Sequence, residues 1–251
     1  MSSRQEQKRR LREQREAEQQ AAAQAQQRKQ RTALIAGGVA LIALIAVVVL
    51  VVVSQSGDDK QASTSDVFAG LPMKGITLGD ANAPVTVAEF ADLQCPFCRD
   101  FAVEELPDIV KDYVKPGDVK MEMHLLAFIG PESEAGRGVA AGAAEQDLIW
   151  PFTENVYNNQ GTENSGYMND QFLTEQASNV EGLDVDKAFA AAKSEFAQRY
   201  ATESDQEAQD AGVSSTPSFA VTPEGGETKV VDADGLTDAI DDALEQADSG
   251  K

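Results

Sequence analysis

Along residues 73–251 apolar residues recur with the spacing of strands in some segments and with the spacing of helices in others, and this change predicts the secondary-structure elements. Residues 85–93 form a continuous apolar, β-prone segment, which predicts a strand. From Arg99 to Val114 the apolar residues follow a helical period, and Pro107 is expected to kink or break that helix. Alternation at residues 119–128 predicts a second strand. Strand, helix and strand in this order predict a parallel crossover unit and therefore an α/β fold.

The next eighty or so residues have a mainly helical pattern. We expect helices at 135–146, 170–177 and 186–206, another beginning at 150, and a loop at 160–166. After residue 213, short strands are expected at 218–221 and 228–231, joined by a turn at 223–226, and an amphipathic helix at 236–247. A short edge strand is expected at 75–79. The pattern therefore predicts one domain, residues 73–251, with a helical insertion at about 131–211. Four aromatic residues of the insertion are expected in its core: Trp150, Phe152, Tyr157 and Phe172.

The N-terminal quarter has a different character. Residues 1–31 form a charged, Gln-rich tail, and no charge occurs between Arg31 and Asp58. The uncharged stretch from Ala33 to Val53 is long enough to cross a bilayer, which takes about 20 helical residues. We therefore expect residues 32–53 to be a transmembrane signal anchor, followed by a flexible linker at 54–72.

The charges beside this stretch predict its orientation. Basic residues precede it, so the positive-inside rule places the tail in the cytoplasm and the following domain outside, on a single-pass membrane protein. A cleavable signal peptide is the alternative, although its apolar core is usually only about 7–15 residues. An extracytoplasmic domain would lie where disulfides form and persist.

Net charge is −21, but residues 1–31 carry nine Lys or Arg and four Glu, so their balance is +5 and the remainder carries −26. Such an acidic domain argues against nucleic acid as a partner. The charge is instead typical of a soluble, exposed domain.

The segment Cys95-Pro96-Phe97-Cys98 holds both cysteines of the chain. It lies between the predicted strand and helix, and a C-x-x-C in that position is typical of thioredoxin-like redox proteins. At a helix N-terminus, free N–H groups and the helix dipole favour the nucleophilic thiolate. Pro96 suits the first helical position. We therefore expect Cys95 to be an exposed attacking thiol and Cys98 a buried resolving thiol.

The cysteine pair has two other interpretations. A structural zinc site usually needs four Cys or His ligands, and the chain offers two cysteines and one histidine, His124. The pair could also be two buried cysteines without a shared role. We favour the redox pair and expect neither a metal nor a cofactor.

Two segments carry a resemblance to the DsbA family of thioredoxin-fold proteins. Residues 83–90 leading into the cysteine motif form the first, and residues 212–219, Gly-Val-Ser-Ser-Thr-Pro-Ser-Phe, form the second. With the helical insertion between them, the likeness covers about residues 75–247. It implies a thioredoxin-like fold with an inserted helical subdomain, preceded here by one transmembrane helix.

The resemblance also implies roles. Cys95 matches the nucleophile, Cys98 the resolving cysteine, and Glu89 the buried acid that accepts or relays the Cys98 proton. The alternative for Glu89 is an exposed strand carboxylate. Some family members pair this acid with a lysine. The strand at 119–128 has no clear match to that lysine, and Lys120 and His124 are candidates only.

A second set of roles concerns substrate and redox tuning. Thr216-Pro217 matches a cis-proline loop whose backbone at Thr216 pairs with a substrate strand. Pro96 and Phe97, the residues between the cysteines, match the positions that tune the potential. Strongly oxidising members carry histidine where this chain has Phe97. That ring offers neither charge nor a hydrogen bond and is expected to exclude some water, so we expect a Cys95 pKa between about 3.5 and 8.5.

The predicted function is a membrane-tethered thiol–disulfide oxidoreductase that acts on unfolded or partly oxidised exported proteins. The resemblance implies a DsbB- or VKOR-like membrane protein as its redox partner. A reductase or isomerase of the same fold is the near alternative. A more distant one is a non-catalytic metal carrier, using the cysteine pair with His124, or a chaperone domain.

Overall fold

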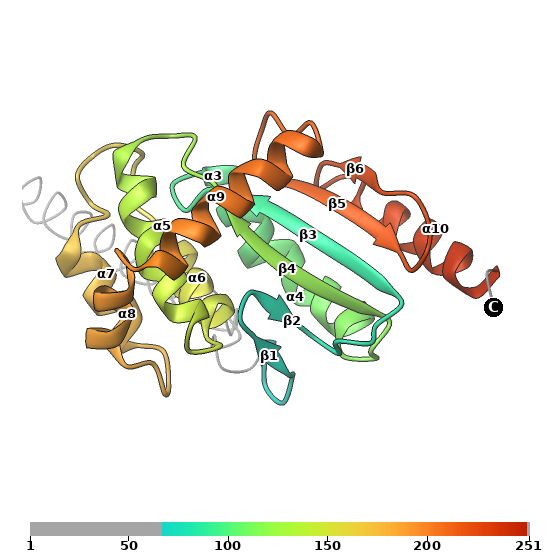
Figure 1. Cartoon of the computed structure of the whole chain (residues 1–251), viewed down its shortest axis with the longest axis horizontal. Helices are drawn as coiled ribbons and strands as arrows, with labels where there is room; N and C mark the ends of the chain where they lie inside the picture. Colours follow the sequence, from blue (N-terminus) through green and yellow to red (C-terminus); the bar gives the residue numbers. More distant parts are fainter. Residues whose placement is uncertain (1–66, 250–251) are drawn as a thin grey trace, which may run out of the picture. The chain divides into compact units, whose positions relative to one another are not determined.

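A computed structural model of the chain describes residues 67–249 (Figure 1). The predicted tail at 1–31, the predicted membrane span at 32–53 and most of the predicted linker at 54–72 lie outside the described residues. Between residues 67 and 249 no helix has the length and apolar character needed to cross a bilayer.

A six-stranded sheet forms the centre of the domain, in the order β1-β2-β4-β3-β5-β6. Its strands are β1 (Met73–Lys74), β2 (Thr77–Leu78), β3 (Val85–Ala91), β4 (Val119–Leu125), β5 (Ser218–Pro223) and β6 (Lys229–Val231). Only β3 and β4 are parallel; each of the other neighbouring pairs is antiparallel. The parallel pair confirms the predicted crossover unit.

The N-terminal edge of the sheet differs from the prediction. Instead of one edge strand at 75–79, β1 and β2 form a small antiparallel hairpin, and β2 pairs with β4. Gly75 has a φ of 60°, a conformation that glycine adopts without a steric penalty, and lies in the turn between the two strands. A second difference is that β4 ends at Leu125 rather than at 128.

The helical segment after the cysteine motif is continuous but distorted. It comprises α3 (Pro96–Asp100), the π-helical turn η1 (Phe101–Glu105), α4 (Leu106–Ile109) and a second π-helical turn, η2 (Val110–Val114). Pro107 lies between the two wide turns, and the Leu106 N–H bonds to the carbonyl of Phe101, five residues earlier. Of the predicted kink or break at Pro107, the break is wrong: the helix continues, but wide turns on both sides of Pro107 distort it, and they accommodate a residue that lacks an N–H.

The predicted helical insertion is present between β4 and β5. The insertion consists of α5 (Pro131–Ala144), α6 (Ile149–Asn158), α7 (Asp170–Ser178), α8 (Val185–Ala191) and α9 (Glu195–Asp210). One further helix, α10 (Leu236–Ser249), follows β6. The single helix expected at 186–206 is wrong, since α8 and α9 are separate. Ser194 caps α9 by accepting a hydrogen bond from the Ala197 N–H at 3.2 Å, which starts a new helix there.

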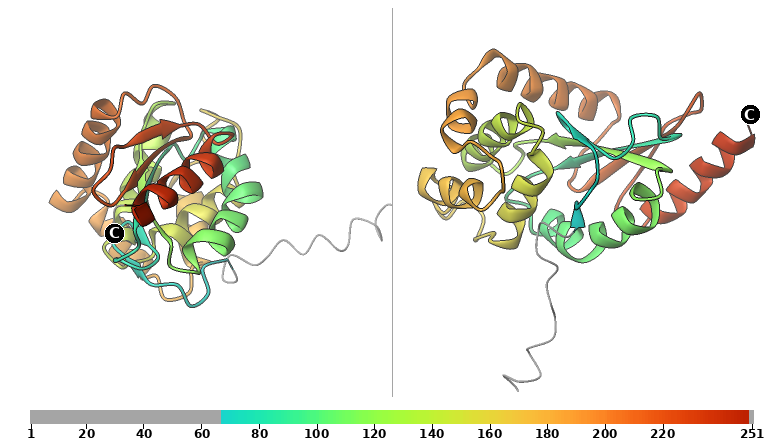
Figure 2. Two further views of the ribbon diagram at one scale, coloured as in Figure 1. Left: turned by 90° about the vertical axis from the view of Figure 1, so that its right-hand side faces the viewer. Right: turned by 90° about the horizontal axis from the view of Figure 1, so that it is seen from below.

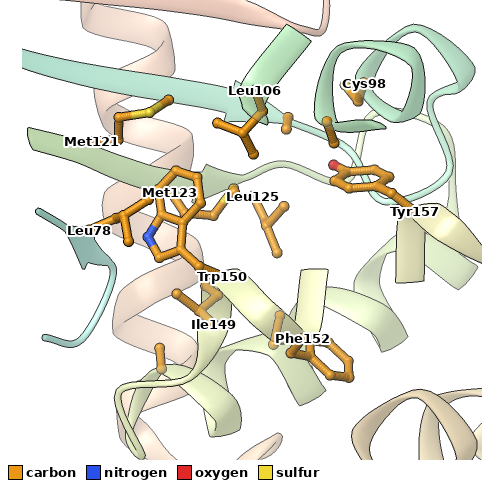
Figure 3. Close-up of a cluster of buried hydrophobic side chains, with 14 of the residues drawn as sticks. Leu78, Cys98, Leu106, Met121, Met123, Leu125, Ile149, Trp150, Phe152 and Tyr157 are labelled. Atoms are coloured by element: carbon orange, nitrogen blue, oxygen red, sulfur yellow. The ribbon is translucent and has the colours of Figure 1, made fainter. Parts of the chain in front are cut away.

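Helices cover both faces of the sheet, as the two views of Figure 2 show. On one face, Phe90 of β3 and Ala220 of β5 pack with Ala208 of α9 in a small apolar cluster. On the other face, β3, β4 and β5 pack with the α3–η2 segment, α6 and α10 in the main core. Figure 3 shows part of that core, including Trp150 and Tyr157 of α6.

The core prediction for the four aromatic residues is confirmed for three of them. Trp150, Phe152 and Tyr157 are buried, whereas Phe172 is only partly buried and stacks edge-on against Tyr167. Trp150 also donates its indole N–H to the carbonyl of Ile76 at 2.9 Å, which ties α6 to the N-terminal hairpin.

Candidate active site

Strand β3 and helix α3 place the cysteine pair at the end of the sheet. Cys95 is the N-cap of α3, with φ −71° and ψ 121°, and Pro96 occupies the first helical turn, as predicted. The Cys95 thiol donates a hydrogen bond to the carbonyl oxygen of Thr216 at 3.3 Å. Both cysteines are free thiols. The chain thus brings the motif and the proline loop together, although 121 residues separate them.

Cys95 is less accessible than the sequence predicted. The residue is only 5% exposed and its sulfur contacts the Thr216 carbonyl, whereas Pro96 and Phe97 are exposed. The expectation of an exposed thiol is therefore wrong.

The surroundings of Cys95 stabilise its thiolate. Its pKa is lowered to about 6, chiefly by a hydrogen bond from the Cys98 thiol. Hydrogen bonds from the Thr216 hydroxyl and from the backbone N–H groups of Phe97 and Cys98 act in the same direction, and partial burial opposes them. The value lies within the interval predicted from the sequence. At neutral pH, Cys95 is therefore mainly the nucleophilic thiolate, and the hydrogen bond that it donates to the Thr216 carbonyl exists only while the thiol is protonated.

Cys98 has the opposite character. It is fully buried, and burial raises its pKa well above the ordinary value; the nearby Cys95 sulfur raises it further. The two thiols therefore differ in charge at neutral pH, with Cys95 ionised and Cys98 protonated. Such a difference suits an attacking thiol and a resolving thiol that loses its proton only during reaction.

Glu89 of β3 lies on the face of the sheet that carries the main core, because it is spaced two residues from Val87 and from Ala91, which belong to that core. It is 1% exposed, so the exposed strand carboxylate considered above is wrong. Neither carboxylate oxygen has a hydrogen-bond partner, and desolvation raises the pKa of Glu89 to about 8. A carboxyl group with a pKa of about 8 is mostly protonated at neutral pH, and it loses its proton at a pH only slightly higher.

Lys120 and His124 do not pair with Glu89, since they lie on the opposite face of the sheet. Along a strand, side chains alternate between faces. Met121 and Met123 of β4 belong to the main core, so the residues between and beside them point the other way. Accordingly the His124 ring lies 5.3 Å from that of Phe90, on the α9 side. Both candidates for a relay partner are therefore wrong.

The position of His124 also tests the alternative of a metal carrier. His124 faces Glu207 of α9 at 3.3 Å and is separated from Cys95 and Cys98 by the sheet. The proposed Cys-Cys-His site is therefore wrong. Among residues 67–249, no three Cys, His, Asp or Glu side chains are grouped so that they could hold a metal ion.

The proline loop and α3 border a surface groove of about 330 Å³. The Thr216-Pro217 peptide bond is cis, as the resemblance implied. The groove is lined by apolar and acidic residues together: Phe97, Asp100, Phe101, Glu105, Ser215, Thr216, Pro217, Asp232, Ala233 and Asp234. Burial and the charges of Asp234 and Glu104 raise the pKa of Glu105, so these carboxylates act on one another.

Phe97 forms part of this groove rather than a cover over the cysteine. It is 69% exposed, which makes it the most exposed large apolar side chain among the described residues. The expectation that its ring excludes water from Cys95 is therefore not supported by its position. Phenylalanine at this position supplies neither charge nor a hydrogen bond to the thiolate.

Sequence reasoning missed the polar groups that hold the loop before Cys95. The buried Asp92 carboxylate accepts hydrogen bonds from the Gln94 N–H at 2.9 Å, the Ile129 N–H at 3.0 Å and the Ser133 hydroxyl at 2.6 Å. Gln160 donates to the carbonyls of Leu93 and Cys95 at 2.9 and 3.1 Å. The one sequence signal was polar residues, Asp92 and Gln94, interrupting the apolar run just before the motif.

Comparison with known proteins agrees with this geometry. The family model described as Thioredoxin matches residues 73–242. The probable disulfide bond formation protein D of Bacillus anthracis is 32% identical over 120 residues, which cover 46% of this chain and 54% of that protein. The disulfide bond formation protein D of Bacillus subtilis is 36% identical over 111 residues, covering 41% and 48% respectively. The chain thus aligns with only about half the length of these curated relatives.

Solved structures show the same fold. The oxidised BdbD of Bacillus subtilis superposes with a TM-score of 0.60 at 24% identity, covering 68% of this chain and 93% of that one. A thioredoxin-like oxidoreductase from Silicibacter pomeroyi gives 0.56 at 25% identity, covering 74% and 98%. DsbA1 of Wolbachia pipientis also gives 0.56, at 17% identity, covering 75% and 99%. Because the family match spans more than half of the chain, this protein belongs to the thioredoxin family and has the DsbA-like form of the fold that its cysteine motif and proline loop predicted.

Proposed function

We propose that this protein is a thiol–disulfide oxidoreductase that forms or exchanges disulfides in other proteins. The observation that carries the proposal is the pairing of an activated Cys95, whose pKa is about 6, with a fully buried Cys98 one helical turn away. The names of the Bacillus relatives support the same activity.

Oxidation of a substrate takes two exchange steps. A substrate thiolate attacks the Sγ of Cys95 in the Cys95–Cys98 disulfide; a mixed disulfide forms and Cys98 leaves as a thiolate. A second substrate thiolate then attacks the substrate sulfur of the mixed disulfide, and Cys95 leaves as a thiolate. The substrate loses two electrons and the enzyme pair gains them. The low pKa of Cys95 makes it a good leaving group in the second step.

Glu89 supplies the proton that the buried thiolate needs. Cys98 leaves the disulfide as an anion in the core, where its pKa lies well above the ordinary value. The Glu89 carboxyl, protonated at neutral pH, gives its proton to Cys98 and becomes a carboxylate. In the reverse direction Glu89 takes the proton as Cys98 attacks a mixed disulfide on Cys95. The residue is thus a proton donor and acceptor for the resolving thiol.

The substrate would bind as an extended segment beside Thr216. The backbone there lies 3.3 Å from the Cys95 sulfur, so a strand paired with it would carry its own cysteine toward Cys95. Phe97 and Pro217 give this groove an apolar part that suits unfolded chains. Unfolded or partly oxidised exported proteins fit that description.

A direct assay tests the activity. The oxidised chain should introduce a disulfide into a reduced, unfolded protein that has two cysteines, at a rate proportional to enzyme concentration. A Cys95→Ser variant, which keeps Cys98 and the fold, serves as the control. An active Cys95→Ser variant, or an inactive oxidised wild type, would contradict the proposal. Metal content and holdase activity measured on the same preparation test the carrier and chaperone alternatives.

The direction of exchange is a further part of the proposal. We infer that the protein works as an oxidase, reoxidised by a DsbB- or VKOR-like membrane protein, because a stabilised Cys95 thiolate favours the reduced pair and so makes the disulfide oxidising. A reductase or isomerase is the alternative. The reduction potential of the pair, measured against glutathione, decides between them: a value near that of thioredoxin, about −270 mV, would favour the reductase.

We also propose that the chain is anchored by residues 32–53, with residues 1–31 in the cytoplasm and the redox domain outside the membrane. The uncharged stretch and its basic N-terminal flank support this arrangement. Protease added to intact cells should remove the domain and spare the tail. A fully protected domain in cells with intact membranes, digested only after lysis, would rule out the proposed topology.

A further inference from the structure

The turn that leads into Cys95 is held by side chains of the helical insertion. It spans residues 92–95 and is closed by a hydrogen bond of 3.0 Å from the N–H of its last residue to the carbonyl of its first. The side chain of the buried Gln94 donates to the Ser133 hydroxyl at 2.9 Å and accepts from the Asn164 N–H at 2.8 Å. Both partners belong to the insertion, so this part of the chain holds the turn through hydrogen bonds.

Gln160, two residues beyond the end of α6, bonds to the backbone of the nucleophile itself. Its side-chain amide nitrogen donates to the Leu93 carbonyl at 2.9 Å and to the Cys95 carbonyl at 3.1 Å. A primary amide nitrogen carries two hydrogens, so one group can hold both carbonyls. The Arg99 N–H bonds to the same Cys95 carbonyl at 3.1 Å as part of the helix, and Gln160 adds a donor that the helix does not supply. The Gln160 N–H in turn donates to the Tyr157 carbonyl at 3.2 Å, which fixes the glutamine to the end of α6.

The carbonyl of Cys95 controls how its sulfur is oriented. It belongs to the peptide unit between Cys95 and Pro96, and because proline has no N–H, this carbonyl is the only hydrogen-bonding group of that unit. Rotation of the unit about ψ of Cys95 would move the N–H groups of Phe97 and Cys98 relative to the sulfur. Next to the hydrogen bond from the Cys98 thiol, these N–H groups lower the pKa of Cys95. A donor that fixes the carbonyl therefore also fixes how the sulfur meets them.

We propose that Gln160 is a positioning residue that holds the Cys95 peptide unit in the orientation in which the thiolate faces the N–H groups at the start of α3. Through this glutamine the helical insertion contributes to the reactivity of a cysteine that lies outside it. The inference rests on the proposed function, in which Cys95 is the attacking thiol, and it assigns part of the activation of that thiol to a residue that acts through the backbone.

A substitution that removes both hydrogen bonds tests the inference. Gln160→Met keeps an unbranched side chain of similar length but has no donor. In the reduced full chain, the pKa of Cys95 should rise by about half a unit to one unit, because the sulfur is held less firmly against the N–H groups. Alkylation by iodoacetamide at pH 6 should then slow by about two- to fivefold, since less of the thiol is ionised. The rate of Cys95 alkylation against pH gives the pKa.

Gln146 offers a matched control within the same insertion. It is half-buried like Gln160, and its amide nitrogen also donates to two backbone carbonyls, those of Gly142 at 3.2 Å and Asp184 at 3.1 Å. Gln146→Met should therefore lower the free energy of unfolding in urea at least as much as Gln160→Met does. It should leave the pKa of Cys95 unchanged, because its bonds join α5 to the start of α8 and not to the turn.

Each outcome of this comparison has one meaning. An unchanged Cys95 pKa in Gln160→Met would overturn the inference. Equal rises in Gln160→Met and Gln146→Met would overturn it too, because the pKa would then respond to a loosened insertion rather than to the lost bonds to the turn. A wild type in which Cys95 has the pKa of an ordinary thiol would instead contradict the proposed function.

Discussion

The sulfur of Cys95 lies 3.3 Å from the carbonyl oxygen of Thr216, and this contact joins the two segments that carry the redox motif and the proline loop. Cys95 is only 5% exposed beside this contact. A substrate segment that pairs with the backbone at Thr216, as proposed above, would therefore bring its cysteine against the Cys95 sulfur.

The different environments of the two cysteines predict different trapping behaviour. Cys98→Ala should accumulate mixed disulfides on Cys95, because the resolving thiol is gone while the activated thiolate remains. Cys95→Ala should trap nothing, since Cys98 is buried and its pKa is well above the ordinary value. Non-reducing gels of cells that express each variant give the measurement. Adducts on Cys95→Ala with none on Cys98→Ala would reverse the assignment.

The local parts of the site could be predicted because they depend on short stretches of sequence. A strand, a C-x-x-C and a helix place Cys95 at an N-terminus and Cys98 one turn inside, whatever the remainder of the chain does. The alternation of β3 and β4 likewise contained the information that Glu89 and His124 face opposite ways, once the two strands pair in register.

The missing parts depend on contacts between distant segments. The contact to the Cys95 sulfur comes from Thr216, and hydrogen bonds to the Asp92 carboxylate come from Ile129 and Ser133. The spacing of apolar residues along the sequence does not indicate contacts between such distant segments. The division of the predicted helix 186–206 is different in kind, because the cap at Ser194 outweighed a helical pattern that continues on both sides of it.

The residue between the cysteines predicts a change of potential. Phe97→His would place a donor or a positive charge beside the Cys95 thiolate, so the pKa of Cys95 should fall below about 6. Each pKa unit corresponds to about 30 mV for this two-electron couple if only the reduced state is affected. We expect a shift of tens of millivolts toward a more oxidising pair. Thiolate absorbance against pH and titration against glutathione measure both quantities; Phe97→Leu is the uncharged control and should shift neither.

Close packing inside the helical insertion gives a prediction about stability. A Cβ on Gly142 of α5 would overlap the backbone of Ala188 in α8. Gly142→Ala should therefore force α5 and α8 apart and lower the free energy of unfolding by about 1–3 kcal/mol, as overpacking of a core does. Gly117→Ala is the comparison, since a Cβ there meets no atom within 4 Å and its cost comes only from the φ of 92°. Urea denaturation of both variants gives the values; equal small losses would contradict the packing argument.

Glu89 should make the protein less stable as pH rises. Its pKa is about 8 in the folded chain and 4.5 when unperturbed, so both states hold the proton below pH 4.5. Between these values the unfolded chain releases the proton and the folded chain keeps it, which lowers the free energy of unfolding by up to about 1.4 kcal/mol per pH unit. Above about pH 8 the folded chain releases it too, and the slope from this group ends.

Glu89→Gln should remove the contribution of Glu89 to the pH dependence of the free energy of unfolding. The variant should therefore exceed the wild type in stability at pH 7.5, and the difference should be smallest near pH 4. Glu154, whose pKa burial also raises to about 8, is the matched control. Glu154→Gln should reduce the pH slope of stability as well, but it should leave the thiol exchange of Cys98 unchanged, because only Glu89 is assigned to that proton. Denaturant unfolding of the reduced proteins between pH 4 and 9, with the exchange rates measured in parallel, tests both statements. A Glu89→Gln variant with the wild-type pH slope would show that Glu89 ionises in the folded core at an ordinary pH, and its assignment as the proton donor to Cys98 would then fail.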